Sequence, residues 1–477
     1  MSEELEQNLI DAQFELLLFD KDAAKLQEFL NDQGISDVVA LIDRYPENEA
    51  AIISNMAVHR ASRVFKLLDI STQKSIIKEL PPFKTAELLN QLSPDDRTDF
   101  LEELPKSALR DLIKLLNPEE VKITLRMLGY PEDSVGRLMT PDYIYVYETD
   151  TVAEAFRIIR KNGKNSETID VIYVINKKGE LVDDFRIRDL ILASSDMKIS
   201  ELMDGRIIAL NVNDDQEKAG HIFRMNNRVA LPVVDDNNIL LGIVTIDDIL
   251  WVTNEEYSED MQKMGGTEAL DEPYLDTPFF KLIRKRAPWL IILFLSEMLT
   301  TSAMTHYSDE LQNATVLALF IPLIMSSGGN SGSQASTLII QAMAVGEVTI
   351  KDWWRIMRRE ILSGLTLGLI LGIIGFLRIS LWELLHNLGV WDITYGEHWL
   401  MIALTVGSAL VGIILWGSLT GSMLPILLKK LGADPATSSA PFVATLVDVT
   451  GIIIYFVTAY LVMGQLIQSG ALNIPTG

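Results

Sequence analysis

Hydrophobic residues are distributed unevenly along the chain. From Ala287 onward they form five long apolar spans, roughly 287–305, 311–344, 356–381, 400–428 and 436–466. A bilayer helix needs about 20 apolar residues, so each span is long enough to cross a membrane. The pattern predicts a multi-domain protein, in which a soluble part precedes an all-α polytopic membrane domain of five transmembrane helices, residues 283–477.

A leucine recurs every 12 residues in the first part of the chain, at Leu68, Leu80, Leu92, Leu104, Leu116 and Leu128. Proline follows closely after most of these leucines, and proline suits the first turn of a helix but not its interior. Each unit is therefore expected to be a short helix and a turn, stacked on the next unit. Residues 1–137 are predicted to form an α-superhelical N-terminal domain.

A longer repeat follows. The segment that begins at Leu138 resembles the segment that begins at Leu202, and both follow the order strand, helix, two strands, helix. This α/β pattern resembles a tandem pair of cystathionine-β-synthase-type (CBS) regulatory domains, residues 138–200 and 201–254. The first copy departs from the second, because Asp183 and Asp184 stand where the second copy has a Leu-Gly-Ile-Val segment. A nucleotide pocket is therefore not expected in the first copy.

The formal net charge of −24 is concentrated in the soluble part. Residues 287–477 contain 11 acidic and seven basic residues, so almost all of the excess acid lies before them. An acidic surface argues against binding of nucleic acid. The chain has no cysteine, which excludes disulfides and thiolate metal sites. The N-terminal sequence lacks the basic start and apolar run of a signal peptide, so the soluble part is expected in the cytoplasm.

Basic residues flank the apolar spans asymmetrically. They occur before the first span, after the second and after the fourth, at Lys281, Arg284, Lys285, Arg286, Lys351, Arg355, Arg358, Arg359, Lys429 and Lys430. The loops on the other side contain no lysine or arginine. The positive-inside rule then places the N-terminus in the cytoplasm and the C-terminus outside a cytoplasmic (inner) membrane.

Two carboxylates fall inside apolar spans, Asp448 in the fifth and Glu297 in the first. A charged side chain that faced lipid would cost several kcal/mol, so such residues usually face an interior or a pore. Ala440, Ala444, Asp448, Gly451 and Tyr455 recur at spacings of three and four, which gives one helix face of mainly small residues. The alternative for Asp448 is a protonated side chain that hydrogen-bonds across a helix pair.

The second span contains Pro322 and the glycine-rich segment Ser326–Gln334. Because the span is too long for one straight helix, we expect this segment to interrupt it. Broken helices at membrane depth often line ion routes. The alternative is a kink combined with close helix packing.

Carboxylates also cluster in the soluble part, around Asp95, near Asp214 and between Asp247 and Asp260. Like charges at helical spacing repel each other, and a divalent cation would relieve the repulsion. Mg²⁺ prefers oxygen ligands and often uses only one or two carboxylates. The alternative for any single cluster is a solvated acidic surface.

Several motifs together resemble the MgtE family of bacterial Mg²⁺ transporters and channels: LGYPEDSVGRLMT (128–140), the CBS pair, PLIMSSGGNSGSQASTLIIQA (322–342) and LPILLKKLGADPATSSAPFVATLVDVTGIIIYF (424–456). The resemblance implies a homodimer in the lipid bilayer, with a pore between the subunits and no enzymatic activity. Asp448 would bind hydrated Mg²⁺, helped by the carbonyl of Ala444 and the close approach of Gly451. The segment Gly328, Gly329 and Asn330 would shape the pore wall.

The resemblance also implies regulation. Residues 255–282 would be a connecting plug helix that closes the pore. Regulatory Mg²⁺ would bind between the N-terminal and CBS domains, at Asp95, Asp99, Glu103, Asp214, Glu217, Asp247, Asp248, Glu255, Glu256 and Glu259. An adenine nucleotide could occupy the second CBS copy. The alternative function is a CBS-regulated secondary carrier or an exporter of divalent cations.

Overall fold

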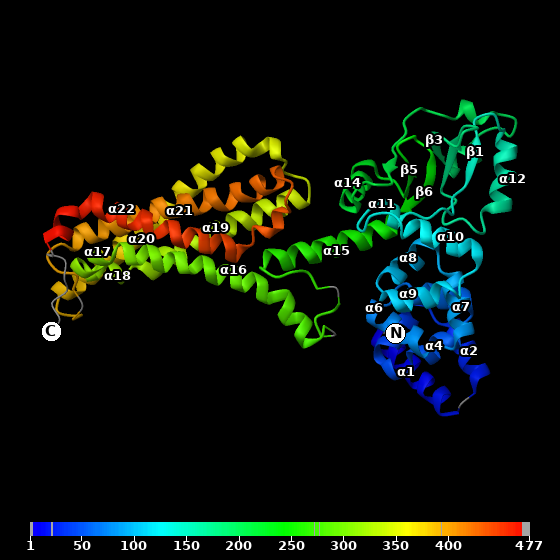
Figure 1. Ribbon diagram of the computed structural model, residues 1–477, viewed down its shortest axis with the longest axis horizontal. Helices are drawn as coiled ribbons and strands as arrows, with labels where there is room; N and C mark the ends of the chain where they lie inside the picture. The colour runs from blue at the N-terminus through cyan, green and yellow to red at the C-terminus, as the bar shows by residue number, and fades with distance from the viewer. Residues whose placement is uncertain (1–2, 21, 271, 276, 393, 470–477) are drawn as a thin grey trace. The chain divides into compact units, whose positions relative to one another are not determined.

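The computed structural model describes residues 3–20, 22–270, 272–275, 277–392 and 394–469 (Figure 1). Contacts between residues divide the chain into two compact units, Met1–Glu255 and Glu256–Gly477. Each unit is described by itself below. Residues 470–477 of the predicted membrane domain lie outside the described residues.

The first unit begins with a stack of short helices, as predicted. They are α1 (Glu3–Asp20), α2 (Ala23–Asp32), α3 (Ile35–Arg44), η1 (Pro46–Asn48), α4 (Glu49–Ser54), α5 (Val58–Phe65), α6 (Ile70–Glu79), α7 (Pro82–Gln91), α8 (Pro94–Glu102), α9 (Lys106–Ile113), α10 (Pro118–Met127) and α11 (Val135–Leu138). Proline occupies the first turn of α7, α8 and α10. Leu68, Leu80 and Leu92 follow helix ends and are buried in one continuous core. The 12-residue repeat therefore corresponds to one helix and turn.

Two small sheets follow, one in each CBS copy, and they confirm the predicted α/β repeat. The first copy contains β1 (Tyr145–Tyr147), α12 (Val152–Asn162), β2 (Val171–Ile175), β3 (Leu181–Arg186), α13 (Ile187–Leu192) and η2 (Ile199–Glu201). The second contains β4 (Leu210–Asn211), α14 (Gln216–Asn226), β5 (Ala230–Val234), β6 (Leu240–Thr245) and α15 (Ile246–Met264). In each sheet the first two strands are parallel and the third is antiparallel to the second. Residues of both sheets share an apolar core.

The acidic pair that distinguishes the first copy has local partners. Asp183 is fully buried and accepts a hydrogen bond from the Gly205 amide at 3.0 Å. Asp184 forms an ion pair with Arg228 of the second copy at 2.8 Å. The pair therefore ties the first copy to the linker and to the second copy.

The connecting segment is only partly helical. Helix α15 begins inside the second CBS copy at Ile246 and ends at Met264. The described residues between Met264 and Phe279, where α16 begins, are not helical. The expected plug helix over 255–282 thus corresponds to the last part of α15, a non-helical described stretch and the first residues of α16. The predicted end of the second CBS copy at 254 falls inside α15, because helical structure continues across it.

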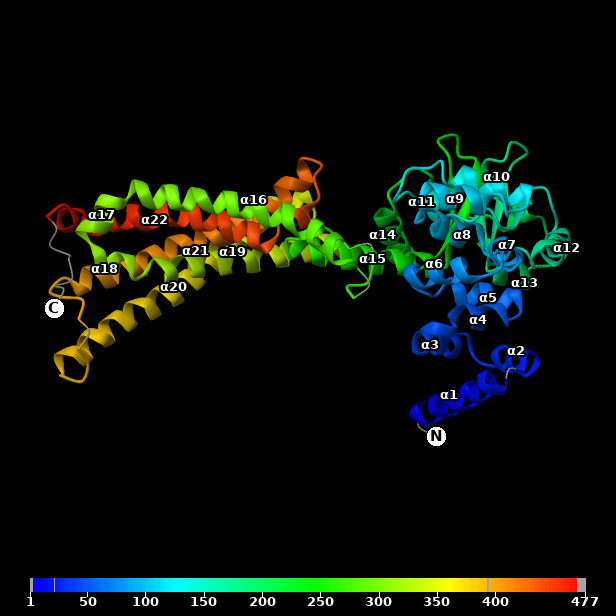
Figure 2. The same cartoon turned by 60° about the horizontal axis from the view of Figure 1, so that its bottom comes forward.

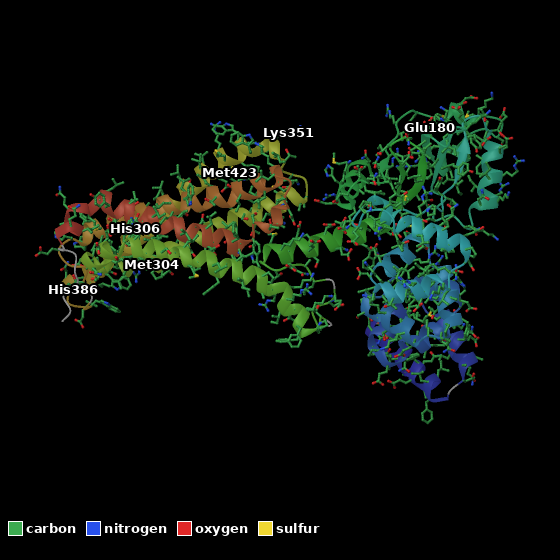
Figure 3. The ribbon with its side chains drawn as sticks, viewed as in Figure 1. Glu180, Met304, His306, Lys351, His386 and Met423 are labelled. Atoms are coloured by element: carbon green, nitrogen blue, oxygen red, sulfur yellow. The ribbon has the colours of Figure 1, made fainter. Side chains whose placement is uncertain are left out.

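The second unit contains the membrane helices: α16 (Phe279–His306), α17 (Ser308–Asn313), α18 (Thr315–Ala318), α19 (Ile321–Ala344), η3 (Ile350–Asp352), α20 (Trp353–Asn387), α21 (Trp399–Lys430), η4 (Pro435–Thr437) and α22 (Ala440–Ser469). Among the described residues, five helical spans are long and apolar enough to cross a membrane. Figure 3 shows Lys351 at one end of this bundle and both His306 and His386 at the other.

The glycine-rich segment does not break its helix, contrary to the expectation from sequence. Helix α19 continues from Ile321 through all of Ser326–Gln334. The interruption comes earlier, between α18 and α19, and Pro322 lies in the first turn of α19, where proline is tolerated. The glycines serve close packing instead. A Cβ atom on Gly421 of α21 would lie 2.1 Å from the Gly332 carbonyl oxygen, so these helices touch through their backbones.

Candidate cation sites

Asp448 lies in the first third of α22 and is half-buried within the second unit. The helix face predicted from sequence packs against α19: the Ser333 hydroxyl donates to the Ala440 carbonyl at 3.0 Å. At the far end of the same face, the buried Tyr455 hydroxyl donates to the Leu317 carbonyl at 3.0 Å. These contacts hold the backbone near Asp448 against a neighbouring helix, so α22 is fixed on both sides of the carboxylate.

Gly329 of α19 lies directly opposite Asp448. A Cβ atom at this position would lie 3.3 Å from the Ala444 Cβ and 3.8 Å from Asp448 Oδ1. The neighbouring Gly328 is buried against Ile413 and Val447 and serves packing. Because Gly329 has no side chain, the carboxylate and the Ala444 backbone stay close to α19. The structure thus brings Asp448, Ala444 and Gly329 together.

Asn330 and Gly451 occupy different surroundings. The Asn330 side chain is exposed, and its amide lies 3.4 Å from the Ser326 hydroxyl. Gly451 is buried, one turn beyond Asp448 on α22.

Three carboxylates in the first unit lie close enough together to bind one metal ion. One oxygen from each of Asp95, Asp96 and Asp248 lies within 4.8 Å of the others. Asp95 and Asp96 open α8, whereas Asp248 belongs to the first turn of α15 in the second CBS copy. Asp95 is 7% exposed, and its Oδ1 has no hydrogen-bond partner in the described part of the chain. These oxygen donors suit a hard divalent cation.

The same carboxylates resist ionisation. Burial, with repulsion from Asp96 and Asp248, raises the pKa of Asp95 well above its usual value. Burial also raises the pKa of Asp248 to about 6, although the Thr245 hydroxyl, which donates to this carboxylate at 2.6 Å, works in the opposite direction. The fold therefore keeps acidic groups together at an electrostatic cost that a cation would remove.

Lys66 brings a positive charge to this group. It extends from the end of α5, and its Nζ lies 3.4 Å from Asp96 Oδ2. The ammonium also interacts electrostatically with Asp95 and Asp248. The three carboxylates are thus partly neutralised by the protein itself.

The other predicted cytosolic residues lie outside this group of three. Asp214 is paired with Lys218 at 2.6 Å, and Glu103 with Lys74 at 3.7 Å. Asp99 and Glu217 are exposed. The Asp247 carboxylate lies within hydrogen-bond distance of the same Thr245 hydroxyl, and Glu255, Glu256 and Glu259 follow along α15. Of the ten predicted residues, Asp95 and Asp248 belong to this group of three, while Glu255 lies close enough to Asp99 to act on it electrostatically.

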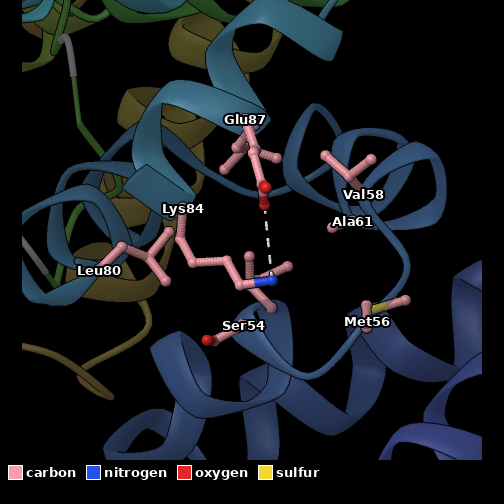
Figure 4. Close-up of a pocket in the computed structure, with 9 residues that line it drawn as sticks. Ser54, Met56, Val58, Ala61, Leu80, Lys84 and Glu87 are labelled. Atoms are coloured by element: carbon pink, nitrogen blue, oxygen red, sulfur yellow. Dashed lines mark ion pairs between the residues drawn. The ribbon is translucent and has the colours of Figure 1, made fainter. Parts of the chain in front are cut away.

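Sequence reasoning did not assign a role to Asp96 or Lys66. The signal for Asp96 was the pair of adjacent aspartates in a first helical turn, a pattern shared by Asp95–Asp96 and Asp247–Asp248. Lys66 gave no signal, because one lysine some 30 residues away has no periodic relation to α8. A small hollow elsewhere in the first unit has aliphatic walls, with Lys84 and Glu87 3.6 Å apart at its edge (Figure 4). It has no chemistry related to these sites.

Comparison with protein families accounts for most of the chain. Residues 321–458 match the model of the MgtE family, described as divalent cation transporters. Residues 33–133 match the MgtE intracellular N domain, and residues 135–196 and 199–254 match CBS domains. The matched regions follow the order of the structural parts described above.

Individual relatives agree with this assignment. The magnesium transporter MgtE of Thermus thermophilus is 39% identical over 334 residues, which cover 70% of this chain and 71% of the relative. The magnesium transporter MgtE of Bacillus subtilis is 29% identical over 92% of this chain and 94% of its own length. A solved cytosolic domain of the Mg²⁺ channel MgtE in complex with ATP is 32% identical, with a TM-score of 0.49, over 50% of this chain and 98% of that structure. With five apolar spans, the family-model matches and the two transporter relatives, the chain is a multi-pass membrane protein of the MgtE family of divalent cation transporters.

Proposed function

We propose that this protein transports Mg²⁺ into the cell through a channel-like pore of a homodimer, and that cytosolic Mg²⁺ closes the pore. The main observation behind the proposal is the position of Asp448. Its carboxylate lies in the membrane half, next to the Ala444 backbone and to Gly329, which has no side chain. Relatives named as magnesium transporters support the choice of ion. Hydrated Mg²⁺ would be the transported substrate, and the membrane potential alone would drive it inward, by about 2.3 kcal/mol per charge per 100 mV.

The proposed orientation has the N-terminus in the cytoplasm and the C-terminus outside. It is supported by the basic loop residue Lys351, which lies at the opposite end of the bundle from His306 and His386 (Figure 3). The loops at the His306 end contain no lysine or arginine, as the positive-inside rule requires of an outer face.

The regulatory site would be the group Asp95, Asp96 and Asp248, joined by other acidic residues along α15. Mg²⁺ bound between α8 and the first turn of α15 would hold the N-terminal helices and the second CBS copy together. Loss of the ion would restore repulsion between the carboxylates and separate these elements. The arrangement with the domains together would bind Mg²⁺ more tightly than the arrangement with the domains apart. Such a difference in affinity between two states is what allostery requires.

The link to the pore would be the end of α15. In the second unit, Lys263 Nζ lies 2.7 Å from Asp434 Oδ2, just before α22 begins. Gly266 adopts a positive φ of 76° and packs against Trp289, which a Cβ atom would approach to 2.6 Å. The end of α15 therefore contacts the segment that precedes α22, the helix that contains Asp448.

The direct test is Mg²⁺ flux into liposomes that contain the purified protein, with the internal Mg²⁺ concentration and the voltage varied independently. We expect a flux that follows voltage, ignores imposed proton and sodium gradients, and falls as internal Mg²⁺ rises. A flux that needs a proton or sodium gradient would instead support the secondary carrier. Flux that is indifferent to internal Mg²⁺ would refute the regulatory part of the proposal.

A further inference from the structure

Helices α16 and α22 lie side by side in the second unit (Figure 2). Aromatic contacts between them define their register. Near the start of both helices, the Trp289 ring lies 6.1 Å from the Phe442 ring, and its indole donates to the Ser439 hydroxyl at 3.1 Å. Near the end of α16, Tyr307 stacks on Phe456 with ring centroids 4.5 Å apart. Residue numbers rise together, so the two helices are parallel.

This register places Glu297 level with Asp448. Glu297 follows Trp289 by eight residues and Asp448 follows Phe442 by six, while ten and eight residues remain before the Tyr307–Phe456 contact. With about 1.5 Å of rise per residue, Glu297 lies about 3 Å further along the axis than Asp448 when counted from the first contact. Counted back from the second contact, Glu297 lies about 3 Å less far along, so the two positions are level to within about 3 Å. The charge of Glu297 is close enough to act electrostatically on Asp448.

Neither carboxylate is neutralised by a basic side chain. Both residues are half-buried, and neither has an ion-pair partner among the described residues. Two carboxylates at one depth in a membrane repel each other strongly, because the surrounding dielectric constant is low. Either a cation between them or a shared proton would relieve the repulsion.

A third polar group favours the cation. Thr300 lies one turn beyond Glu297 on the same face of α16, and it is only 4% exposed. Its hydroxyl has no hydrogen-bond partner in the described chain, whereas Ser302 and Thr305 of the same helix donate to the carbonyl four residues back at 3.1 and 2.9 Å. A buried hydroxyl without a protein partner is suited to bind an ordered water. Mg²⁺ retains several waters when it binds to proteins.

We propose that Glu297 is the second carboxylate of the intramembrane cation site, and that the Thr300 hydroxyl binds a water of the hydrated divalent ion. This inference rests on the proposed function, because it takes Asp448 as the first carboxylate. Glu297 adds negative charge beside the ion and raises its local concentration. Asp448 remains the indispensable ligand, since the Ala444 backbone and Gly329 face it directly.

The experiment compares Glu297→Gln, Asp448→Asn and the wild-type protein for Mg²⁺ uptake in liposomes over a range of external Mg²⁺. We expect Glu297→Gln to raise the half-saturating Mg²⁺ concentration about tenfold while uptake continues, and Asp448→Asn to abolish uptake. Asp309→Asn, which neutralises an exposed carboxylate just beyond α16, is the matched control and should match the wild type.

The outcomes separate the two proposals. Normal uptake by Asp448→Asn would overturn the proposed function itself. Loss of uptake in Asp448→Asn together with an unchanged half-saturating Mg²⁺ concentration in Glu297→Gln would overturn only the role of Glu297. If, in addition, uptake by Glu297→Gln had lost a pH dependence that the wild type shows, the two carboxylates would share a proton instead of a cation. If Glu297→Gln does not fold, Thr300→Val and Thr300→Ser test the site instead. Thr300→Val should raise the half-saturating Mg²⁺ concentration, whereas Thr300→Ser, which keeps the hydroxyl, should not. The same half-saturating concentration in both variants would contradict the site.

Discussion

At the scale of a single residue, Lys66 partly neutralises the acidic group Asp95, Asp96 and Asp248. Its ammonium lies 3.4 Å from Asp96 and shares the space in which a divalent cation would bind Asp95, Asp96 and Asp248. Two unit charges 4 Å apart interact by about 1 kcal/mol in water and by about 4 kcal/mol near a protein surface. A built-in cation of this kind weakens the binding of any other cation at the same carboxylates.

We therefore predict that Lys66→Met tightens regulatory Mg²⁺ binding by about tenfold, which corresponds to about 1.4 kcal/mol. Channel closure should then occur at about one-tenth of the internal Mg²⁺ concentration, measured as flux in liposomes. Lys66→Arg keeps the charge and should behave as the wild type. An unchanged or weaker response in Lys66→Met would show that Lys66 does not compete with the ion.

The acidic group also predicts a pH dependence. Burial raises the pKa of Asp95 well above its usual value and that of Asp248 to about 6, so the folded state binds more protons than the unfolded state above about pH 4. Without divalent cations, the stability contributed by these protons is present at low pH and is lost as pH rises from about 4 to about 6.

Thermal unfolding of the full-length protein in a chelator should accordingly show a transition temperature that falls across this window. Saturating Mg²⁺ should reverse most of the fall at the upper end, because the ion replaces the protons. The double variant Asp95→Asn/Asp248→Asn should show a smaller fall and no reversal by Mg²⁺, since other carboxyls with a raised pKa remain, such as Asp99, whose pKa desolvation by the surrounding chain raises to about 7. A wild-type profile that is flat in the chelator would contradict the assignment of these two carboxylates.

At the scale of an element, the proposed regulation depends on helix α15. In the first unit the first turn of α15 contains Asp248, and in the second unit Lys263 of its last turn forms an ion pair with Asp434. Under the proposal, this helix links the acidic group to the segment that precedes α22.

Breaking the contact at the end of α15 should loosen closure. We predict that Lys263→Met leaves maximal Mg²⁺ flux unchanged at low internal Mg²⁺ but raises the residual flux at saturating internal Mg²⁺ several-fold. Lys263→Arg, which preserves the ion pair with Asp434, is the control. Complete closure in Lys263→Met would mean that this ion pair does not help to hold the pore shut.

The helices also show how far the sequence could predict the fold. The leucine repeat, the CBS repeat and the five apolar spans each have a strong period or length, and all three were confirmed. The glycine-rich segment was misread, because glycine weakens a helix in water yet allows close packing in a membrane, as at Gly332 and Gly421. Lys66 could not be predicted, since its role comes from tertiary contacts alone.

At the scale of the whole molecule, charge is divided unevenly along the chain. The residues before Ala287 contain nearly all of the excess acid, and three of their carboxylates are held together at α8 and α15. The residues from Ala287 onward have few charges, and the register of α16 and α22 places two of their carboxylates, Glu297 and Asp448, within about 3 Å of one level. This division supports the proposal of a transporter whose cargo is also its regulator.

The central claim is that Asp448 binds the transported ion, and Mg²⁺ uptake by Asp448→Ala in voltage-clamped liposomes tests it most directly. The account predicts that uptake is abolished while the variant elutes and unfolds like the wild-type protein. Because Gly329 and Ala444 pack without the carboxylate, the fold should tolerate the loss. Uptake at the wild-type rate by this variant would contradict the account.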